Sequence, residues 1–184
     1  MNGLGKRYLN ASFDNFIADN KKMQEAKDTC IAYANSVPTQ NNLLLTGYVG
    51  TGKTLLTAAM INHIENERST VGERITSRTA KAIDIVRSFK KTWERASEVT
   101  EEDVIAAYLY PDLLVIDEVG ASVGSDTEKR FLFDVIDARY NEMKGTVIIS
   151  NQGIDGITEN IGLRCVDRLR QDGTHLEFNW GSKR

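Results

Sequence analysis

The sequence predicts an α/β fold with a parallel sheet of five strands, and two observations lead to that prediction. Continuous apolar runs of strand length, typical of strands buried on both faces, recur along the chain, most clearly at 113–116 and 146–150. Longer stretches with apolar residues at helical spacing separate these runs. Because parallel strands need crossover connections, the alternation favours a sheet flanked by helices.

The first third of the chain is predicted to contain two helices around one strand. Residues 1–20 are polar with interspersed aromatics, and residues 21–36 carry apolar side chains at helical spacing. The apolar run 42–46 has the length of a strand, and helical spacing resumes over 55–67.

The middle third is predicted to contain two strands and two helices. Residues 75–79 alternate weakly and form the expected second strand, and the amphipathic stretch 81–95 forms the helix after it. Residues 100–103 resemble a capping start for a short helix that ends at Leu109. The third strand is the buried run 113–116.

The last third continues the alternation. A helix is expected over 126–143 and a buried strand over 146–150. Two short helices near 154–161 and 164–170 precede a final strand near 176–180.

Composition limits the function classes. The 184 residues fit one domain, and 41% apolar residues suffice for a core without cross-links. A net charge of −3 argues against a protein that coats nucleic acid with its whole surface. The two cysteines, Cys30 and Cys165, have no metal-like spacing and suit a reducing compartment. Without a membrane-length apolar run or signal peptide, we expect a cytoplasmic protein with no membrane partner.

The most specific motif is Gly47-Tyr48-Val49-Gly50-Thr51-Gly52-Lys53-Thr54, which lies between a predicted strand and a predicted helix. This is the GxxxxGK[ST] pattern and context of a phosphate-binding P-loop. Glycines let consecutive backbone N–H groups point at phosphate oxygens, and the following helix adds its dipole. Lys53 is expected to reach the β- and γ-phosphates of ATP, and the Thr54 hydroxyl to ligate Mg²⁺. The expected nucleotide-binding residues are Gly47, Val49, Gly50, Thr51, Gly52, Lys53, Thr54 and Leu55.

The third predicted strand ends in two carboxylates, Asp117 and Glu118. Carboxylates are costly inside a buried strand, so we expect them to emerge at its carboxyl end, where ligands of parallel sheets bind. There Asp117 is placed to hold Mg²⁺ as the Walker B acid does, and Glu118 to orient or deprotonate the attacking water. The alternative is a strand that runs into an acidic turn.

The fourth predicted strand ends in Ser150-Asn151. The Asn151 amide is a candidate to hydrogen-bond the γ-phosphate or the lytic water. Asparagine also forms turns at strand ends, which is the alternative.

Arginines gather toward the end of the chain at Arg164, Arg168, Arg170 and Arg184. Arg164 and Arg168 share one helix face because they are four residues apart. One interpretation is an arginine finger that completes the nucleotide site of a neighbouring subunit. The other is a solvated basic helix that pairs with Asp167 or Asp172.

Cations and an aromatic ring end the predicted helix 81–95. Their combination suits phosphates and a stacked base of single-stranded nucleic acid, although Trp93 fits the apolar stripe of a core-facing helix equally well. The candidate DNA-binding residues are Lys90, Lys91, Trp93 and Arg95, with Arg87 beside them.

Taken together, these motifs resemble the DnaC-type helicase loaders of bacteria and prophages, within the IstB/DnaC-like AAA+ ATPases. The resemblance runs from the leading segment 12–16 through 47–54, 113–120 and 150–151 to the tail, of which 162–169 and 178–184 are the most specific stretches. It implies a P-loop NTPase fold of the AAA+ type. It also implies an ATPase that depends on Mg²⁺, is weak in isolation and helps place a DnaB-type helicase on single-stranded DNA.

The resemblance also implies roles for individual residues. Asn151 matches the sensor-1 position, and Arg168 matches the arginine finger with Arg164 in support. Arg184 matches the sensor-2 arginine, which contacts nucleotide in its own subunit. Single-stranded DNA is expected along the helix after the second strand, with Ser125 and Thr127 as weaker candidates. We therefore expect a homo-oligomer with ATP at its subunit interfaces.

Two features depart from the family pattern. Gly162-Leu163-Arg164 lacks the usual acid before the finger helix, which leaves the partner of Arg164 open. The resemblance divides the chain into a leading segment and helix at 1–40, packed on an ATPase core at 41–184. The family's helicase-binding domain is expected to lie outside this chain.

Other functions remain open from the sequence. An IstB-type transposition helper shares the core motifs. A small-molecule kinase shares the P-loop, but adjacent Asp117 and Glu118 suit attack by water better than transfer to an acceptor. A binding module that uses ATP only as an assembly switch is the fourth possibility.

Overall fold

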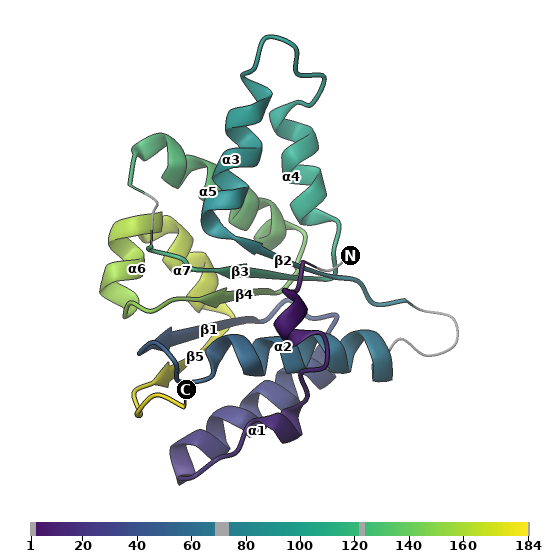
Figure 1. Cartoon of the computed structure of the whole chain (residues 1–184). Helices are drawn as coiled ribbons and strands as arrows, with labels where there is room; N and C mark the ends of the chain where they lie inside the picture. The colour runs from purple at the N-terminus through teal and green to yellow at the C-terminus, as the bar shows by residue number, and fades with distance from the viewer. Residues whose placement is uncertain (1–2, 69–73, 122–123, 184) are drawn as a thin grey trace.

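A five-stranded parallel sheet forms the centre of the computed structural model, which describes residues 3–68, 74–121 and 124–183. The strand order is β2-β3-β4-β1-β5 (Figure 1), and every neighbouring pair runs parallel. This confirms the fold class that the alternating pattern predicts. The strands are β1 (Asn42–Gly47), β2 (Ser77–Lys81), β3 (Leu113–Asp117), β4 (Thr146–Ile149) and β5 (Gly173–Phe178).

Helices cover both faces of the sheet. The side chains of a strand alternate between its faces, so Leu43 and Leu45 pack with one core and Leu44 with the other. Helices α1 and α2 cover the first face, and α3 to α7 cover the second (Figure 1). The helices are α1 (Lys21–Ser36), α2 (Lys53–His63), α3 (Ala82–Thr92), α4 (Glu101–Leu109), α5 (Asp126–Asn141), α6 (Ile154–Ile161) and α7 (Leu163–Gln171).

Several boundaries differ from the sequence-based expectation; α3, for example, ends at Thr92 rather than at 95, and α5 at Asn141 rather than at 143. Strand β2 begins at Ser77 rather than Ile75, and β5 spans 173–178 rather than 176–180. The apolar pattern predicted the start of β5 too late along the chain, because the first residues of β5 are exposed. Their strand conformation comes from pairing with β1, which begins with Asn42 opposite Gly173. Helix α2 ends at His63 and continues as a short π-helical segment, η3 (Ile64–Arg68), instead of an α-helix to 67.

The leading segment lies against α2. It contains two short 3₁₀ turns, η1 (Lys6–Tyr8) and η2 (Phe13–Asn15), and Phe16 is buried in the same core as α1 and α2. A Cβ at Gly52 would lie 2.6 Å from the Phe16 ring, so this segment packs closely beneath the P-loop.

The strand order brings the polar strand ends together. Strand β1 leads into the P-loop, β3 ends at Asp117, and β4 lies between them and leads into Ser150. Because all the strands are parallel, their carboxyl ends lie at one edge of the sheet. Helices α3 and α4 project from the body on the opposite side of the sheet from α1 (Figure 1). Within the described part of the chain, no helix is long and apolar enough to cross a membrane.

Candidate nucleotide-binding site

A cavity of about 440 Å³ lies at the carboxyl ends of β1, β3 and β4. Most residues that the sequence analysis assigned to nucleotide line it. They are Val49, Gly50, Thr51, Gly52, Lys53, Thr54, Leu55, Asp117, Glu118 and Asn151. Residues far apart in the sequence therefore converge on one site because the sheet aligns the strand ends.

The P-loop has the conformation that its glycines permit. Gly50 and Gly52 have φ angles of +80° and +99°, which side-chain-bearing residues rarely adopt, and Gly52 precedes the first turn of α2. Gly47, also predicted to bind nucleotide, does not line the cavity; its carbonyl accepts a hydrogen bond from Lys53. A Cβ at Gly47 would meet the Phe178 carbonyl oxygen at 2.3 Å, so glycine is required there for packing.

Lys53 is buried beneath the loop, with 4% of its surface exposed. Its Nζ donates hydrogen bonds to the carbonyl oxygens of Gly47 and Tyr48, both at 2.7 Å. Burial lowers the pKa of the ammonium, and the charge of Asp117 opposes that shift. The loop thus holds a partly desolvated cation at the cavity wall, where a phosphate oxygen would interact strongly with it.

Asp117 and Glu118 occupy the expected strand end. Burial raises the pKa of Asp117. The backbone N–H of Glu118 donates a hydrogen bond to Asp117 Oδ1 at 2.6 Å, and this bond counteracts the rise. Glu118 has a φ of +57°, an uncommon conformation for a residue with a side chain. The turn directs the two successive acids differently: Asp117 is half-buried and Glu118 exposed.

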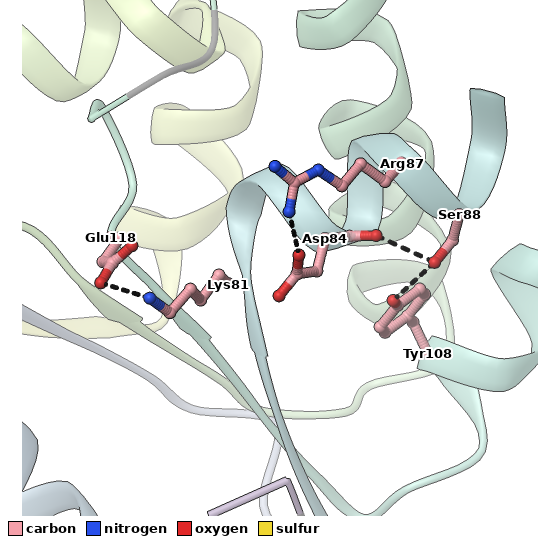
Figure 2. A network of polar contacts seen from close by, with 6 residues as sticks. All are labelled: Lys81, Asp84, Arg87, Ser88, Tyr108 and Glu118. Carbon is pink, nitrogen blue, oxygen red and sulfur yellow. Dashed lines mark hydrogen bonds and ion pairs between the residues drawn. The ribbon is translucent and has the colours of Figure 1, made fainter. Parts of the chain in front are cut away.

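Lys81 is a site residue that the sequence analysis did not identify. It ends β2 opposite Asp117, and its Nζ donates to Glu118 Oε1 at 2.8 Å (Figure 2). The pair raises the pKa of Lys81. Figure 2 also shows Asp84 and Arg87, paired at 3.0 Å in the helix that Lys81 leads into. The sequence signal was weak because Lys81 marks the junction of an irregular strand and a charged helix.

The donor set fits a magnesium ion that is bound together with phosphate. Thr54 and Asp117 both line the cavity and offer a hydroxyl and a carboxylate oxygen. Among the described residues no group of three or more His, Cys, Asp or Glu side chains forms a metal cluster. Two protein oxygens match Mg²⁺, which takes its other ligands from phosphates and water.

Hydrogen bonds of a buried serine hydroxyl hold the end of β4 in place. Ser150 is buried, and its Oγ donates to the Val119 carbonyl at 2.7 Å and accepts from the Gln152 N–H at 3.0 Å. Asn151 is exposed and lines the cavity. Ser150 therefore links the ends of β3 and β4 and leaves Asn151 beside the nucleotide position.

Both ends of the chain contribute residues that the motifs did not indicate. The leading segment lines the cavity with Arg7, Tyr8, Asn10, Ala11 and Asn15, and the tail with Lys183. The tail also supports the loop from behind, since the Trp180 indole N–H donates to the Thr51 carbonyl and the Lys183 N–H to the Gly50 carbonyl. Only the fold brings these distant segments to the P-loop.

The tail arginines lie elsewhere. Arg168, on α7, does not line the cavity and pairs with Asp137 of α5, with its guanidinium 5.1 Å from the Tyr140 ring centre. The interpretation of a solvated basic helix predicted Asp167 or Asp172 as the partner, whereas Arg168 pairs with Asp137. Arg164 is exposed on the same helix, and Arg184 lies outside the described residues.

The candidate DNA-binding residues lie on and after α3. Lys90 pairs with Glu128 at 2.7 Å, and the Trp93 indole N–H donates to Glu101. The Trp93 ring lies 5.5 Å from that of Phe131, yet 57% of Trp93 is exposed, so it has both a packed and an accessible face. Lys91 and Arg95 are exposed. Of the weaker candidates, Ser125 caps α5, because its hydroxyl accepts from the Glu128 N–H, and Thr127 is exposed.

Known proteins resemble this chain in sequence and fold. A replicative helicase loader DnaC of Buchnera aphidicola subsp. Baizongia pistaciae is 29% identical over 99% of this chain and 72% of that protein. The crystal structure of the DnaC helicase loader matches with a TM-score of 0.79 and 22% identity, over 94% of this chain and 99% of that one. The replication initiator DnaA bound to AMPPCP and single-stranded DNA matches with a TM-score of 0.77 and 20% identity, over 97% and 51%.

At these identities the structural matches establish the fold alone, which is that of the AAA+ P-loop proteins. The sequence match to a family model is more direct. The model described as IstB-like ATP binding protein covers residues 10–163, which include the P-loop, both strand-end acids and Asn151. The chain belongs to this family of IstB-like ATP-binding proteins.

Proposed function

We propose that this protein is an ATP-hydrolysing helicase loader of the DnaC type, which helps place a DnaB-type replicative helicase on single-stranded DNA. The convergence of Lys53, Thr54, Asp117, Glu118 and Asn151 on one cavity is the observation that supports it most. Similarity to a loader along 99% of the chain favours this function over the other P-loop functions.

In this proposal each site residue has a separate task. Lys53 transfers its hydrogen bonds from the loop carbonyls to the β- and γ-phosphates, while the amides of residues 50–54 bind the phosphate oxygens. Thr54 and Asp117 hold Mg²⁺, which neutralises charge on the phosphates when it is bound. Glu118 accepts a proton from the attacking water, and Asn151 orients the terminal phosphate.

ATP binding and turnover by site variants test the enzymatic part. We expect Lys53→Ala to abolish ATP binding. Glu118→Gln should bind ATP normally and lose roughly 100-fold or more in turnover, because general-base catalysis contributes at least that much. Phosphate release is measured with no added acceptor, with and without single-stranded DNA. Transfer of the terminal phosphoryl group to a small-molecule acceptor, without release of free phosphate, would instead identify a kinase. Turnover unaffected by Glu118→Gln would show that Glu118 is not the base.

The exposed cations Lys91, near the end of α3, and Arg95, after it, are the proposed contact with single-stranded DNA. Lys91→Ala combined with Arg95→Ala should weaken binding and reduce the slope of log affinity against log salt by ~1.4, the value for two lost phosphate contacts. Lys21→Ala, at the first residue of α1, where 91% of the lysine side chain is accessible, is the control. An unchanged slope in the double variant would place the DNA contact elsewhere.

Helicase loading is the decisive assay for biological function. With a DnaB-type helicase and closed single-stranded circles, the wild-type protein and ATP should accelerate the appearance of helicase-bound circles, and Lys53→Ala should not. The family model is named for IstB-like proteins, so a transposition helper is the second candidate. Preference for duplex over single-stranded DNA, without any effect on loading, would favour that candidate.

A further inference from the structure

One side chain of α2 holds the leading segment beside the cavity. The Asn62 carboxamide nitrogen lies within hydrogen-bond distance of the main-chain carbonyl oxygens of Tyr8 (3.1 Å), Leu9 (3.2 Å) and Ala11 (2.8 Å). A carboxamide has two N–H donors, so three acceptors use its full donor capacity. We call residues 5–16 the strap.

The strap depends on such outside support. Its internal backbone bonds are turns, such as Tyr8 N–H to the Gly5 carbonyl and Ala11 N–H to the Tyr8 carbonyl. It joins no strand of the sheet, and its buried side chains are Ala11 and Phe16. Few buried contacts mean that such a segment opens at low free-energy cost, so each bond to α2 strongly affects its position.

Besides the P-loop, the ends of β3 and β4 and Lys183 of the tail, the strap lines the nucleotide cavity. The loop's amides and Lys53 serve the phosphate end. The strap lines the cavity with one cation, Arg7, and otherwise with neutral groups: the Tyr8 ring, Ala11 and the carboxamides of Asn10 and Asn15. An aromatic face and neutral hydrogen-bonding groups suit a base and a ribose better than a phosphate. The nucleoside end of a bound nucleotide would therefore face the strap.

We propose that Asn62 is a positioning residue for nucleotide binding, which fixes the strap against the nucleoside end of the cavity. The inference rests on the proposed function, because it assumes a nucleotide in this site. Asn62 does not line the cavity itself and acts through the carbonyls of Tyr8, Leu9 and Ala11. Since Lys53 begins the same helix, a single element places both the phosphate cradle and the strap.

The test compares ligands that occupy different parts of the cavity. Calorimetry measures the binding of ATP, ADP and inorganic tripolyphosphate to the wild type, Asn62→Ala and Asn62→Asp. Asn62→Ala should weaken ATP and ADP roughly tenfold, the effect of losing one or two hydrogen bonds, and leave tripolyphosphate within about twofold. Asn62→Asp, which places a carboxylate against three carbonyl oxygens, should weaken both nucleotides further. In turnover, KM for ATP should rise while kcat stays unchanged.

The controls separate this inference from the proposed function. Asn66→Ala, at an exposed asparagine one turn along, should bind all three ligands like the wild type. Alanine has a higher helix propensity than asparagine, so Asn62→Ala does not weaken α2 itself. If the wild-type protein binds none of the three ligands, the proposed function is wrong. Normal nucleotide binding by both Asn62 variants, or equal weakening of tripolyphosphate, would overturn the positioning role alone.

Discussion

At the scale of single residues, Arg139 of α5 is a cation that serves packing rather than function. It is fully buried, and burial lowers its pKa to about 10. Its guanidinium ties the end of α4 to the starts of β3 and β4. The acceptors are the carbonyls of Tyr108, Leu109, Pro111, Asp112 and Gly145 and the hydroxyl of Thr146.

Arg139→Lys should therefore destabilise the protein strongly. Lysine keeps the charge but offers one ammonium in place of five N–H donors, which leaves several buried carbonyls unpaired. We expect a loss of about 3 kcal/mol or more in the free energy of unfolding, measured in urea. Arg130→Lys, at an arginine whose side chain is 51% exposed, should change it by at most about 0.5 kcal/mol. Similar losses in both variants would contradict the assigned role of Arg139.

Lys81 and Glu118 give a second prediction at this scale. The contact at 2.8 Å holds the Glu118 carboxylate against the Lys81 ammonium, so Glu118 must leave this partner before it can take a proton from the attacking water. Lys81→Ala should raise basal turnover severalfold without changing ATP affinity. The measurement is steady-state hydrolysis beside calorimetry, with Arg87→Ala on the neighbouring helix as control. Lower turnover in Lys81→Ala would mean that the cation assists the reaction.

At the scale of elements, α3 is attached to α5. Lys90 of α3 donates to Glu128 Oε1 at 2.7 Å, and the Gly124 and Ser125 N–H groups donate to the other oxygen of Glu128. These bonds lower the pKa of Glu128 to about 2 from its usual value near 4.5. The carboxylate both caps α5 and joins the proposed DNA-contacting helix to the segment after Glu118.

The free energy of unfolding at acid pH should depend on this link. A pKa lowered in the folded state stabilises the fold above about pH 4.5, and that contribution is lost as the pH falls toward about 2. Glu128→Gln should therefore have a shallower decline in unfolding free energy over this range than the wild type. Glu102→Gln, at an exposed position of α4, is the control. If the unfolding free energies of Glu128→Gln and the wild type decline equally over this range, the link does not lower the pKa of Glu128.

At the scale of the whole molecule, Arg168 requires a second copy of the chain for its proposed role. It lies on α7 and pairs with Asp137, whereas its own nucleotide cavity is at the carboxyl ends of β1, β3 and β4. An arginine finger would reach the cavity of a neighbouring subunit and exchange Asp137 for a phosphate.

Mixing two inactive variants tests that arrangement. Arg168→Ala should bind ATP but not hydrolyse it, and Lys53→Ala should not bind. Mixed together, the first supplies the nucleotide site and the second the arginine, so turnover should return in part and rise with protein concentration. Arg170→Ala, at an exposed position on the same helix, should behave like the wild type. Full turnover by Arg168→Ala alone would exclude the finger.

Local patterns predicted much of this fold. The capping start at 100–103 is a true box, in which Thr100 and Asp103 exchange side-chain and backbone bonds, because capping depends on residues within one turn. Strands β3 and β4 were evident because both are buried on two faces. Strand β5 was misplaced because its first half is exposed and is determined by pairing with β1.

The P-loop, the paired acids and the succession of strands and helices could be read from the amino-acid sequence, since each is specified by residues that are neighbours along the chain. Which distant groups meet around them is set by the folded arrangement: Lys81 meets Glu118, Trp180 meets Thr51, and Asn62 meets the strap. These contacts join segments that approach one another only when the sheet has formed and the helices have packed on it, so no local pattern records them.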